Sequence, residues 1–520
     1  MLKSLENKRI DKRVADIINL MDSDKYKEAL VKLNNYERVY SANRAFKLAK
    51  VGLYIDLGNY LNDKEAVEKG ISTGETCLSN QDFKDYHDSL IYNVSNGIHF
   101  RISRHFKDHG TYFGVERDVH RCIRMLKKSI SISPSPNAMV NLANLYDEVG
   151  RTLEAIIEYD RAAKTDTQFG MVYGNEAIAV QRLAYVSEYK NAYLIRAHQL
   201  FSKAIQYENS VIRSGGSQAL NEFKRKMGEI EEAFKNQKHL LNINLTHPRF
   251  DQDKMGKDEL SYTHFCLEND LYLTLHIFDR HSTGSVGDNI STSFITKVTD
   301  TSEQQRIKET FMRLNEINES YITGRYILWL SQKTSEDLSN ISKQSLLVNN
   351  LDYTAHNIYT GLLKSAYTEG FSTLDKIAGT INYYLNLNQD ERKINYRNIW
   401  YANLNKKDGF NNIIKSQTYH IFGLYSIMRE LGEEFSEIRN SIEHRYFKIG
   451  TLPDPESKTP TFEEFTQRTT EVFYRIKCAI VCLLSFINTC EEFKSRDSTK
   501  SGRMIPVMLA NTDQWLDLWH

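Results

Sequence analysis

The chain has 520 residues, which predicts about two to four domains if one domain takes roughly 150 residues. Hydrophobic residues make up 41% and charged residues 26%, an ordinary globular composition that excludes wholesale disorder. Lys and Arg together number 67, and so do Asp and Glu, so no net charge draws the chain to nucleic acid or to an anionic membrane. Any nucleic-acid site must therefore be a local cleft.

The placement of proline indicates the fold class. None of the 7 prolines precedes Pro134, and none lies between Pro248 and Pro453. Because proline breaks helix interiors, two long stretches without it permit an almost entirely helical protein. We therefore predict an all-α fold.

Cysteine usage and apolar runs indicate the compartment. The 6 cysteines include no Cys-x-x-Cys pair, which fits a reducing cytoplasm. The N-terminal segment MLKSLENKRIDKRVADIINLMD carries charges throughout and has no apolar core of a signal peptide. The longest apolar run, CAIVCLLSFI from Cys478, would span about 15 Å as a helix, half of a bilayer core. We expect a buried helix there, a cytoplasmic protein and no membrane partner.

Residues 137–169 have the pattern of a helical hairpin. Small and large side chains alternate on two helix faces, and Gly150 stands at the turn between them. The face positions are Leu142, Ala143, Tyr146, Ala155, Tyr159 and Ala162. With Gly150 they resemble the tetratricopeptide repeat (TPR). Met139 and Thr167 stand where that family has an early tryptophan and a closing proline.

The pattern of the second helix recurs on both sides of this hairpin. The recurring positions are Ala197, Phe201 and Ala204 on one side, and Cys122, Leu126 and Ser129 on the other. Because one repeat cannot bury its own apolar face, stacked neighbours are expected. We predict an α-solenoid of irregular TPR-like hairpins over residues 1–240, with a plain helical bundle as the alternative.

A change in residue composition marks the start of a second domain. The polar stretch 241–257, with Pro248 and Gly256, predicts a linker, and residues 258–520 follow as a helical bundle domain. The segment LYLTLHIF, from Leu271, is the strongest strand candidate of the chain, and residues 281–300 have the composition of a loop.

Helical patterns dominate the rest of this domain. We predict helices at 302–332, 348–366, 373–387, 411–431 and 434–447. The segment TLPDPESKTP is a loop. Thr461 and Glu464 then form a capping box that opens a last helix ending near Phe493.

Most catalytic signatures are absent from the sequence. It contains no phosphate-binding G-x-x-x-x-G-K-[ST], no G-x-G-x-x-G, no G-x-S-x-G and no H-E-x-x-H. A histidine cluster lies at His99, His105, His109 and His120. No carboxylate or cysteine completes a metal spacing there, so solvated or capping histidines are the simpler interpretation. We expect neither a metal nor a cofactor.

One motif carries chemistry. The segment EFSEIRNSIEHRYFKIG, from Glu434, contains Arg439, Asn440, His444 and Tyr446 in the order R-N-x3-H-x-Y. It follows Gly432, a candidate helix end, and long helical patterns lie on both sides of it. This motif resembles the R-x4-H-x-Y form found in HEPN domains, named for higher eukaryotes and prokaryotes nucleotide-binding. Those domains are helical bundles, and many are metal-independent endoribonucleases.

The surrounding sequence extends the resemblance over about 260–495. The blocks FCLENDLYLTLHIFDRH and DKIAGTINYYLNLNQDERKINYRNIW are similar to those of a bacterial HEPN clade fused to TPR repeats. The alternative is a surface helix on which Arg, Glu and His are solvated and structural.

The chemistry of RNA cleavage without a metal suits these residue types. His444 can serve as general base or acid, and Arg439 offers a planar fork to phosphate oxygens. Asn440 could orient either partner, and Tyr446 could support the phosphate or be a modification target. Five residues rotate a helix by about 140°, so Arg439 and His444 do not share one face. Either Arg439 lies in the first turn and reaches across, or a second chain completes the site.

A further segment could contact RNA. Cationic and aromatic side chains alternate in the segment DERKINYRNIWYANLNKK, from Asp390. In RNA-binding proteins the cations hold phosphates and the aromatic rings stack on bases. The RNA-binding candidates are Lys393, Tyr396, Arg397 and Trp400, together with Arg445 of the motif. In the alternative, the aromatic rings belong to the core and the cations to a solvated face.

These observations predict a metal-independent endoribonuclease that cleaves RNA by attack of its 2′-hydroxyl. The resemblance implies a homodimer and a role in bacterial defence or as a toxin, with the TPR region as sensor or regulator. Two alternatives stay open. The chain could be a non-catalytic scaffold whose TPR groove binds a protein or peptide, or a HEPN toxin silenced by nucleotidylation of Tyr446.

Overall fold

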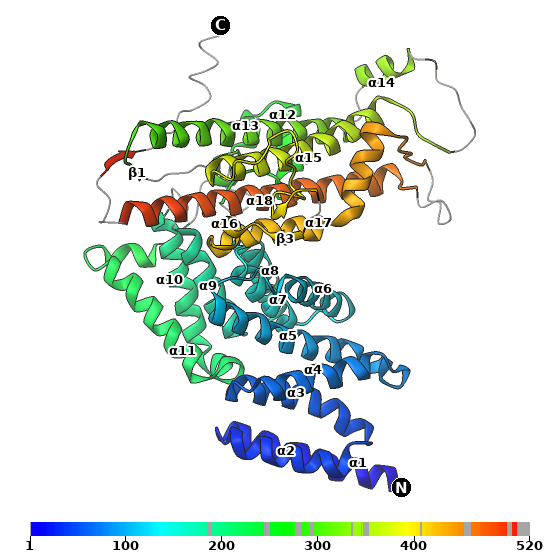
Figure 1. Ribbon diagram of the computed structural model, residues 1–520, viewed down its shortest axis with the longest axis vertical. Helices are drawn as coiled ribbons and strands as arrows, with labels where there is room; N and C mark the ends of the chain where they lie inside the picture. Colours follow the sequence, from blue (N-terminus) through cyan, green and yellow to red (C-terminus); the bar gives the residue numbers. More distant parts are fainter. Residues whose placement is uncertain are drawn as a thin grey trace. The chain divides into compact units, whose positions relative to one another are not determined.

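The computed structural model describes residues 2–184, 190–243, 245, 250–275, 283–290, 295–333, 336–344, 346, 353–405, 408–451, 459–496 and 502–506. Helices account for most of these residues, and the described strands are short (Figure 1). The predicted all-α class is confirmed. Among the described helices, none combines the length and the apolar composition that crossing a membrane requires.

The chain divides into two compact units. One unit comprises Met1–Ala179 and Leu200–Glu229, and the other comprises Val180–Gln199 and Ile230–His520. Residues 180–199 thus belong with the C-terminal unit, where the Tyr193 hydroxyl donates a hydrogen bond to the Leu275 carbonyl. The predicted ranges 1–240, 241–257 and 258–520 stay predictions, and a cut at residue 240 would remove Tyr193 from its partner.

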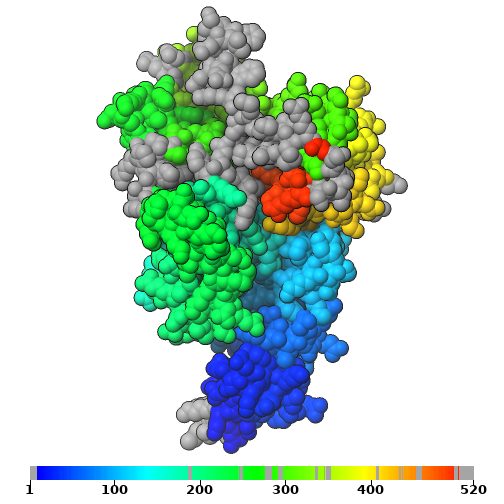
Figure 2. All heavy atoms as spheres, turned by 90° about the vertical axis from the view of Figure 1, so that its left-hand side faces the viewer, coloured from blue at the N-terminus to red at the C-terminus, as the bar shows by residue number. Residues whose placement is uncertain are grey.

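The N-terminal helices stack in successive pairs, as a solenoid requires (Figure 1). Their bounds are α1 Leu2–Asp22, α2 Tyr26–Tyr40, α3 Arg44–Leu61, α4 Lys64–Leu78, α5 His87–His109, α6 Glu116–Ile132, α7 Pro136–Glu148, α8 Thr152–Thr165, α9 Gly170–Ala184, α10 Lys190–Gln206 and α11 Glu208–Ala233. A 3-10 turn at Gln81–Tyr86 precedes α5. Figure 2 shows the blue spheres of the first helices packed together, and one apolar cluster joins α1, α2, α3 and α4.

The predicted hairpin is the pair α7 and α8. Gly150 makes its turn with φ +89°, a left-handed conformation that glycine adopts without strain. All six predicted face positions are buried, and so are the recurring positions in α6 and α10. Asparagines add polar links between helices: Asn141 donates to Asn96 of α5 at 2.7 Å, and Asn175 of α9 donates to Asn144 at 2.9 Å. Stacked helix pairs are therefore established, and membership in the TPR family stays a prediction.

Four long helices form the core of the C-terminal unit. They are α13 Thr301–Gln332, α15 Ile358–Tyr384, α17 Tyr419–His444 and α18 Phe462–Arg496, and they pack against one another. Shorter elements are α12 Lys257–Glu268, α14 Glu336–Lys343 and α16 Asn412–Lys415, with 3-10 turns at Lys238–Asn242, Gln252–Lys254 and Thr283–Ser285. Two antiparallel pairs join β1 Ile295–Val298 to β4 Arg503–Pro506, and β2 Tyr401–Asn403 to β3 Asp408–Phe410.

Two sequence predictions hold in this unit. The helix predicted at 302–332 is α13. The capping box of the last helix is present: the Thr461 N–H donates to Glu464 at 2.8 Å, and the Glu464 N–H donates to the Thr461 hydroxyl at 3.2 Å.

Several predicted boundaries are wrong. The helices predicted at 348–366 and 373–387 are one helix, α15, in which Gly370 marks a close approach rather than a break. A Cβ at Gly370 would stand 3.2 Å from Ile476 of α18. The break between the helices predicted at 411–431 and 434–447 is present as a kink at Gly432 within α17, but residues 412–415 form the separate helix α16 and the second predicted helix ends at His444. The predicted loop 281–300 contains β1.

The strand predicted in LYLTLHIF is also wrong over its described part. Residues 271–275 form an irregular segment, and the rest of that stretch lies outside the described residues. Its apolar side chains are buried without strand pairing, because the side chains of Asp288 and Arg325 form hydrogen bonds with the backbone polar groups of the segment. The Leu273 N–H donates to Asp288 at 2.7 Å, and Arg325 donates to the Leu271 carbonyl at 2.8 Å.

Candidate active site

The predicted motif lies on the second half of α17, beyond a kink at Gly432. This glycine has φ +68° and ψ −172°, a conformation that interrupts the helix. The prediction that a helical segment ends at Gly432 is therefore confirmed. The expectation that Arg439 could lie in a first turn and reach across is wrong, because Arg439 is well inside the second segment and His444 is its last residue.

Two carboxylates hold the Arg439 guanidinium. Its Nη1 donates to Asp375 Oδ2 of α15 at 2.6 Å, and its Nε lies 3.2 Å from a Glu443 carboxylate oxygen. Burial alone would lower the pKa of Arg439. The hydrogen bond that Arg439 donates to Asp375 and the charges of both carboxylates outweigh that effect and raise the pKa of Arg439. Arg439 is therefore a fixed cation in a half-buried place.

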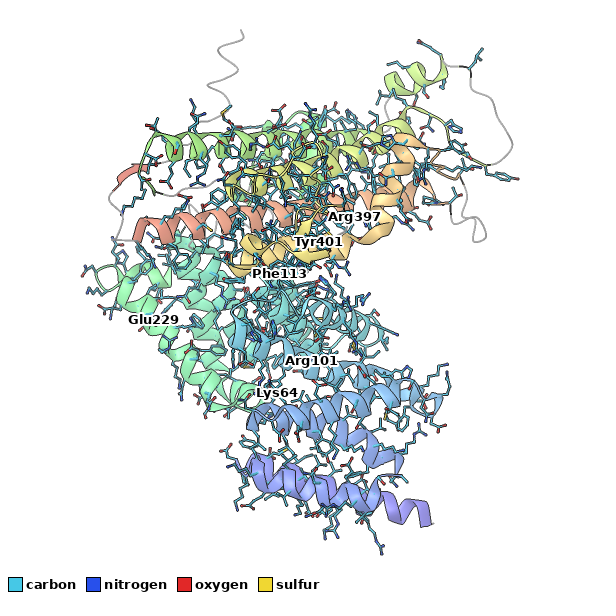
Figure 3. All side chains as sticks on the ribbon, in the orientation of Figure 1. Lys64, Arg101, Phe113, Glu229, Arg397 and Tyr401 are labelled. Carbon is cyan, nitrogen blue, oxygen red and sulfur yellow. The ribbon has the colours of Figure 1, made fainter. Side chains whose placement is uncertain are left out.

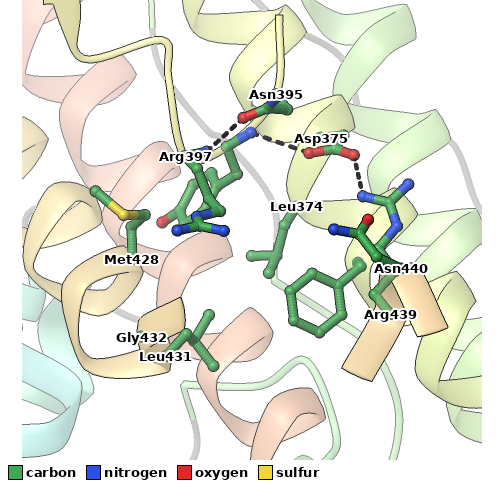
Figure 4. Close-up of a pocket in the computed structure, with 11 residues that line it drawn as sticks. Leu374, Asp375, Asn395, Arg397, Met428, Leu431, Gly432, Arg439 and Asn440 are labelled. Atoms are coloured by element: carbon green, nitrogen blue, oxygen red, sulfur yellow. Dashed lines mark hydrogen bonds and ion pairs between the residues drawn. The ribbon is translucent and has the colours of Figure 1, made fainter. Parts of the chain in front are cut away.

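Asp375 is itself fixed from a second side. Its Oδ1 accepts a hydrogen bond from the Tyr396 backbone N–H at 2.9 Å, and Asn395 in turn accepts one from the Arg397 N–H at 3.0 Å (Figure 4). One carboxylate thus ties α15, the turn at residues 395–397 and the second half of α17 together.

A cavity of about 150 Å³ lies inside the bend of α17, and we call it the elbow cavity. Its lining residues are Phe371, Leu374, Asp375, Asn395, Tyr396, Arg397, Met428, Leu431, Gly432, Arg439 and Asn440. Figure 4 shows Arg397 and Asn440 on opposite sides of this space, with Leu374 between them. The structure therefore brings together four of the predicted site residues, which are Tyr396, Arg397, Arg439 and Asn440.

The other motif residues lie outside the cavity lining, at the exposed end of α17. The His444 side chain is 73% exposed, and its Nε2 lies 3.7 Å from Glu443. Arg445 and Tyr446 are exposed as well, and Tyr446 is in contact range of a cation, with Lys448 Nζ 5.5 Å from its ring centroid. Glu443 therefore stands between the guanidinium of Arg439 and the imidazole of His444.

The predicted RNA-binding segment divides by burial. Tyr396 and Trp400 are 3% and 0% exposed, and each ring packs edge-on against the other at 5.7 Å. Neither ring offers a face to a base, which favours the alternative that both belong to the core. Lys393 is exposed, and Arg397 lines the elbow cavity. Figure 3 labels Arg397 and Tyr401 in the segment that joins α15 to α17.

Sequence reasoning missed three residues near the motif. Asp375 and Glu443 carry no motif signal, although Glu443 at i+4 from Arg439 was a detectable helical pair. His356 is exposed and lies in a segment that pairs with the residues after the motif, since the Ala355 N–H donates to the Ile449 carbonyl at 2.8 Å. Only the folded chain brings His356 to this end of α17.

In the part of the chain that the structure describes, no group of three or more His, Cys, Asp or Glu side chains is arranged to hold a metal ion. In the N-terminal histidine cluster, the ring centroids of His105 and His109 lie 4.4 Å apart with their planes tilted by 44°, and His99 pairs with Glu148 at 3.1 Å.

Comparison with known proteins identifies the class of the C-terminal region. Residues 301–490 match the LA2681-like HEPN family. The match begins at α13, ends within α18, and contains the elbow cavity together with Arg439, His444 and Tyr446. The chain therefore carries an LA2681-like HEPN domain in these residues. No curated protein matches the chain.

Proposed function

We propose that this protein is a metal-independent endoribonuclease that cleaves RNA by attack of the 2′-hydroxyl on the adjacent phosphate. The HEPN match carries the proposal, because HEPN domains are a family of ribonucleases and the matched residues contain the Arg439–His444 motif. Supporting this, Arg439 is a fixed cation beside a cavity and His444 is open to solvent.

Arg439 would stabilise the charge that develops on the phosphate. A guanidinium has five N–H groups, and the bonds to Asp375 and Glu443 use Nη1 and Nε. Nη2 has no hydrogen bond to a described residue and can donate to a phosphate oxygen. Because the two carboxylates already hold the fork in place, little reorganisation is needed when the charge appears.

His444 would move the proton. An imidazole is the side chain best suited to take a proton from the 2′-hydroxyl or to give one to the leaving 5′-oxygen near neutral pH. Its exposure at the end of α17 leaves room for an RNA strand. Glu443 lies 3.7 Å from its Nε2 and is the nearest carboxylate recorded beside the imidazole among the described residues.

One chain supplies one motif histidine, whereas in-line displacement needs an acid and a base on opposite sides of the phosphate. We propose that two copies of the chain form a homodimer and that His444 of each copy enters one cleft. A two-fold dimer is the commonest symmetric assembly. Mixed dimers of wild type and His444→Ala should then keep well under half of the wild-type activity. Activity of half or more would contradict the shared cleft.

His356 is the alternative source of the second proton-transfer group. It is exposed and belongs to a segment hydrogen-bonded to the residues after the motif. If His356→Ala lowers cleavage as much as His444→Ala, the same chain supplies both groups and the dimer is not needed for chemistry.

The proposed activity is tested by incubating the purified chain with total RNA in EDTA. Cleavage should persist in the chelator, and His444→Ala should abolish it. His239→Ala is the matched control, because it removes an exposed histidine outside the matched segment. Cleavage that disappears in EDTA and returns with Mg²⁺ or Mn²⁺ would contradict the mechanism, and so would equal activity of the two variants.

The exposure of Tyr446 favours one mode of control. Its side chain is 59% exposed and two residues beyond His444, so a modifying enzyme could reach it. A nucleotide attached there would place negative charge where RNA must enter. Tyr446→Phe should keep most of the cleavage activity and prevent such silencing, whereas a loss equal to that of His444→Ala would give Tyr446 a role in the reaction itself.

The stacked N-terminal helices would serve as sensor or regulator of the ribonuclease.

A further inference from the structure

The elbow cavity has the composition of a binding site rather than of a packing defect. Its apolar part comes from Phe371, Leu374, Met428 and Leu431, and polar groups of three separate segments meet above it. These are Asp375 of α15, Arg397 of the turn, and Asn440 of α17. Cavities that stay empty in proteins are apolar, whereas the polar groups at this one can hydrogen-bond to a ligand or to water.

The size of the cavity limits what it can take. Its volume of about 150 Å³ is below the roughly 300 Å³ at which pockets for drug-sized molecules begin. A single planar ring system fits a cavity of this volume, whereas a complete nucleotide or a peptide segment of several residues does not. Apolar walls with a few fixed polar groups are the usual surroundings of an unstacked base.

The polar groups also limit the kind of ring. Arg397 donates only, Asp375 accepts only, and the Asn440 amide does both. An edge with a hydrogen-bond acceptor beside a donor matches this combination. All four RNA bases have such an edge: a carbonyl oxygen beside a ring N–H in guanine and uracil, and a ring nitrogen beside an amino group in adenine and cytosine.

The cavity is close to the proposed reaction centre. Asn440 and His444 are four residues apart, so they share one face of the helix with a rise of about 6 Å. Arg439, which would hold the phosphate, also lines the cavity. An RNA strand passing His444 could therefore place the base next to the scissile phosphate inside the bend of α17.

We infer that the elbow cavity binds one unstacked RNA base beside the cleaved bond and so sets the sequence preference. This inference rests on the proposed ribonuclease function. It also changes the expected role of Asn440, which would read the base instead of orienting His444.

The test maps cleavage sites on a pool of single-stranded RNAs with randomised sequence, using the full chain in EDTA. The wild type should show a preferred base at one fixed position beside the cut, enriched roughly tenfold over the least favoured base. Arg397→Ala should cleave more slowly, because it loses an RNA contact, and the products that it forms should lack this enrichment. Arg429→Ala is the matched control, because it removes an exposed arginine of α17 that does not line the cavity.

The outcomes separate the two proposals. Absence of cleavage by the wild type would overturn the ribonuclease function itself. Cleavage with no base preference at any fixed position, or with a preference that Arg397→Ala leaves unchanged, would overturn the base cavity alone. If Arg397→Ala melts at a lower temperature than Arg429→Ala, Asn440→Asp provides the second variant, since it removes the amide donor on the other wall and should also lower the enrichment.

Discussion

Replacing Gly432 by alanine should destabilise the protein through backbone strain and not through crowding. The residue has φ +68° and ψ −172°, a region that only glycine populates readily, and side chains forced there cost about 1–3 kcal/mol. Nothing lies within 4 Å of the position that a Cβ would take. The expected loss in the free energy of unfolding is therefore about 1–3 kcal/mol, with no contribution from steric overlap.

Gly361→Ala is the matched control for this change. Gly361 lies near the start of α15 with nothing within 4 Å of its added Cβ and without positive φ, so alanine should stabilise the helix by about 0.5–1 kcal/mol. Urea unfolding of both variants measures the difference. RNA cleavage by Gly432→Ala should also fall, since straightening α17 moves Arg439 and Asn440 away from the elbow cavity. Equal stabilities of the two variants would refute the argument that a glycine kink shapes the site.

Three further changes test other parts of the account. Asp375→Asn should lower RNA cleavage about tenfold by loosening Arg439 and cost about 1–2 kcal/mol of stability, whereas Asp390→Asn, at an exposed pair, should do neither. Arg325→Met should cost about 3 kcal/mol, because the Asp288 carboxylate, 2.6 Å away, and the Leu271 carbonyl lose their donor in a buried place; a loss under 1 kcal/mol would contradict this. Burial and the charge of Arg182 lower the pKa of His420 to about 3, so the unfolded state, with an ordinary pKa of about 6.5, binds the proton more tightly. Unfolding free energy should therefore fall as pH drops from about 6.5 towards 3, and His420→Gln should flatten this slope.

The sequence predicts helix faces better than helix ends. The face positions of the α7–α8 hairpin follow from burial at regular spacing, and the Thr461–Glu464 capping box is a local signal that needs no tertiary contact. The continuity of α15 through Gly370 could not be predicted, because it depends on the approach of Ile476 from α18. The irregular segment after Leu271 depends in the same way on Arg325 and its distant partners.

The candidate site shows the same division. Arg439 and His444 stand out as a motif, and their separation around the helix follows from geometry alone. Asp375 and Arg397 join them only because α15 and the turn after it fold against α17. Tyr396 and Trp400 show the opposite case. Aromatic rings among cations fit base stacking and a place in the hydrophobic core equally well, and only the burial of the two rings decides between these interpretations.

The chemistry of the RNA ends tests the central claim most directly. Attack by the 2′-hydroxyl leaves a 2′,3′-cyclic phosphate on one fragment and a 5′-hydroxyl on the other. Attack by water on the phosphate gives no cyclic phosphate and does not require a 2′-hydroxyl in the substrate. A synthetic RNA oligonucleotide should be cut by the wild-type chain in EDTA to a 2′,3′-cyclic phosphate and a 5′-hydroxyl, identified by mass spectrometry. His444→Ala should leave it intact. Products with a 5′-phosphate and a 3′-hydroxyl, or cleavage of the same oligonucleotide with 2′-deoxy sugars, would contradict the account.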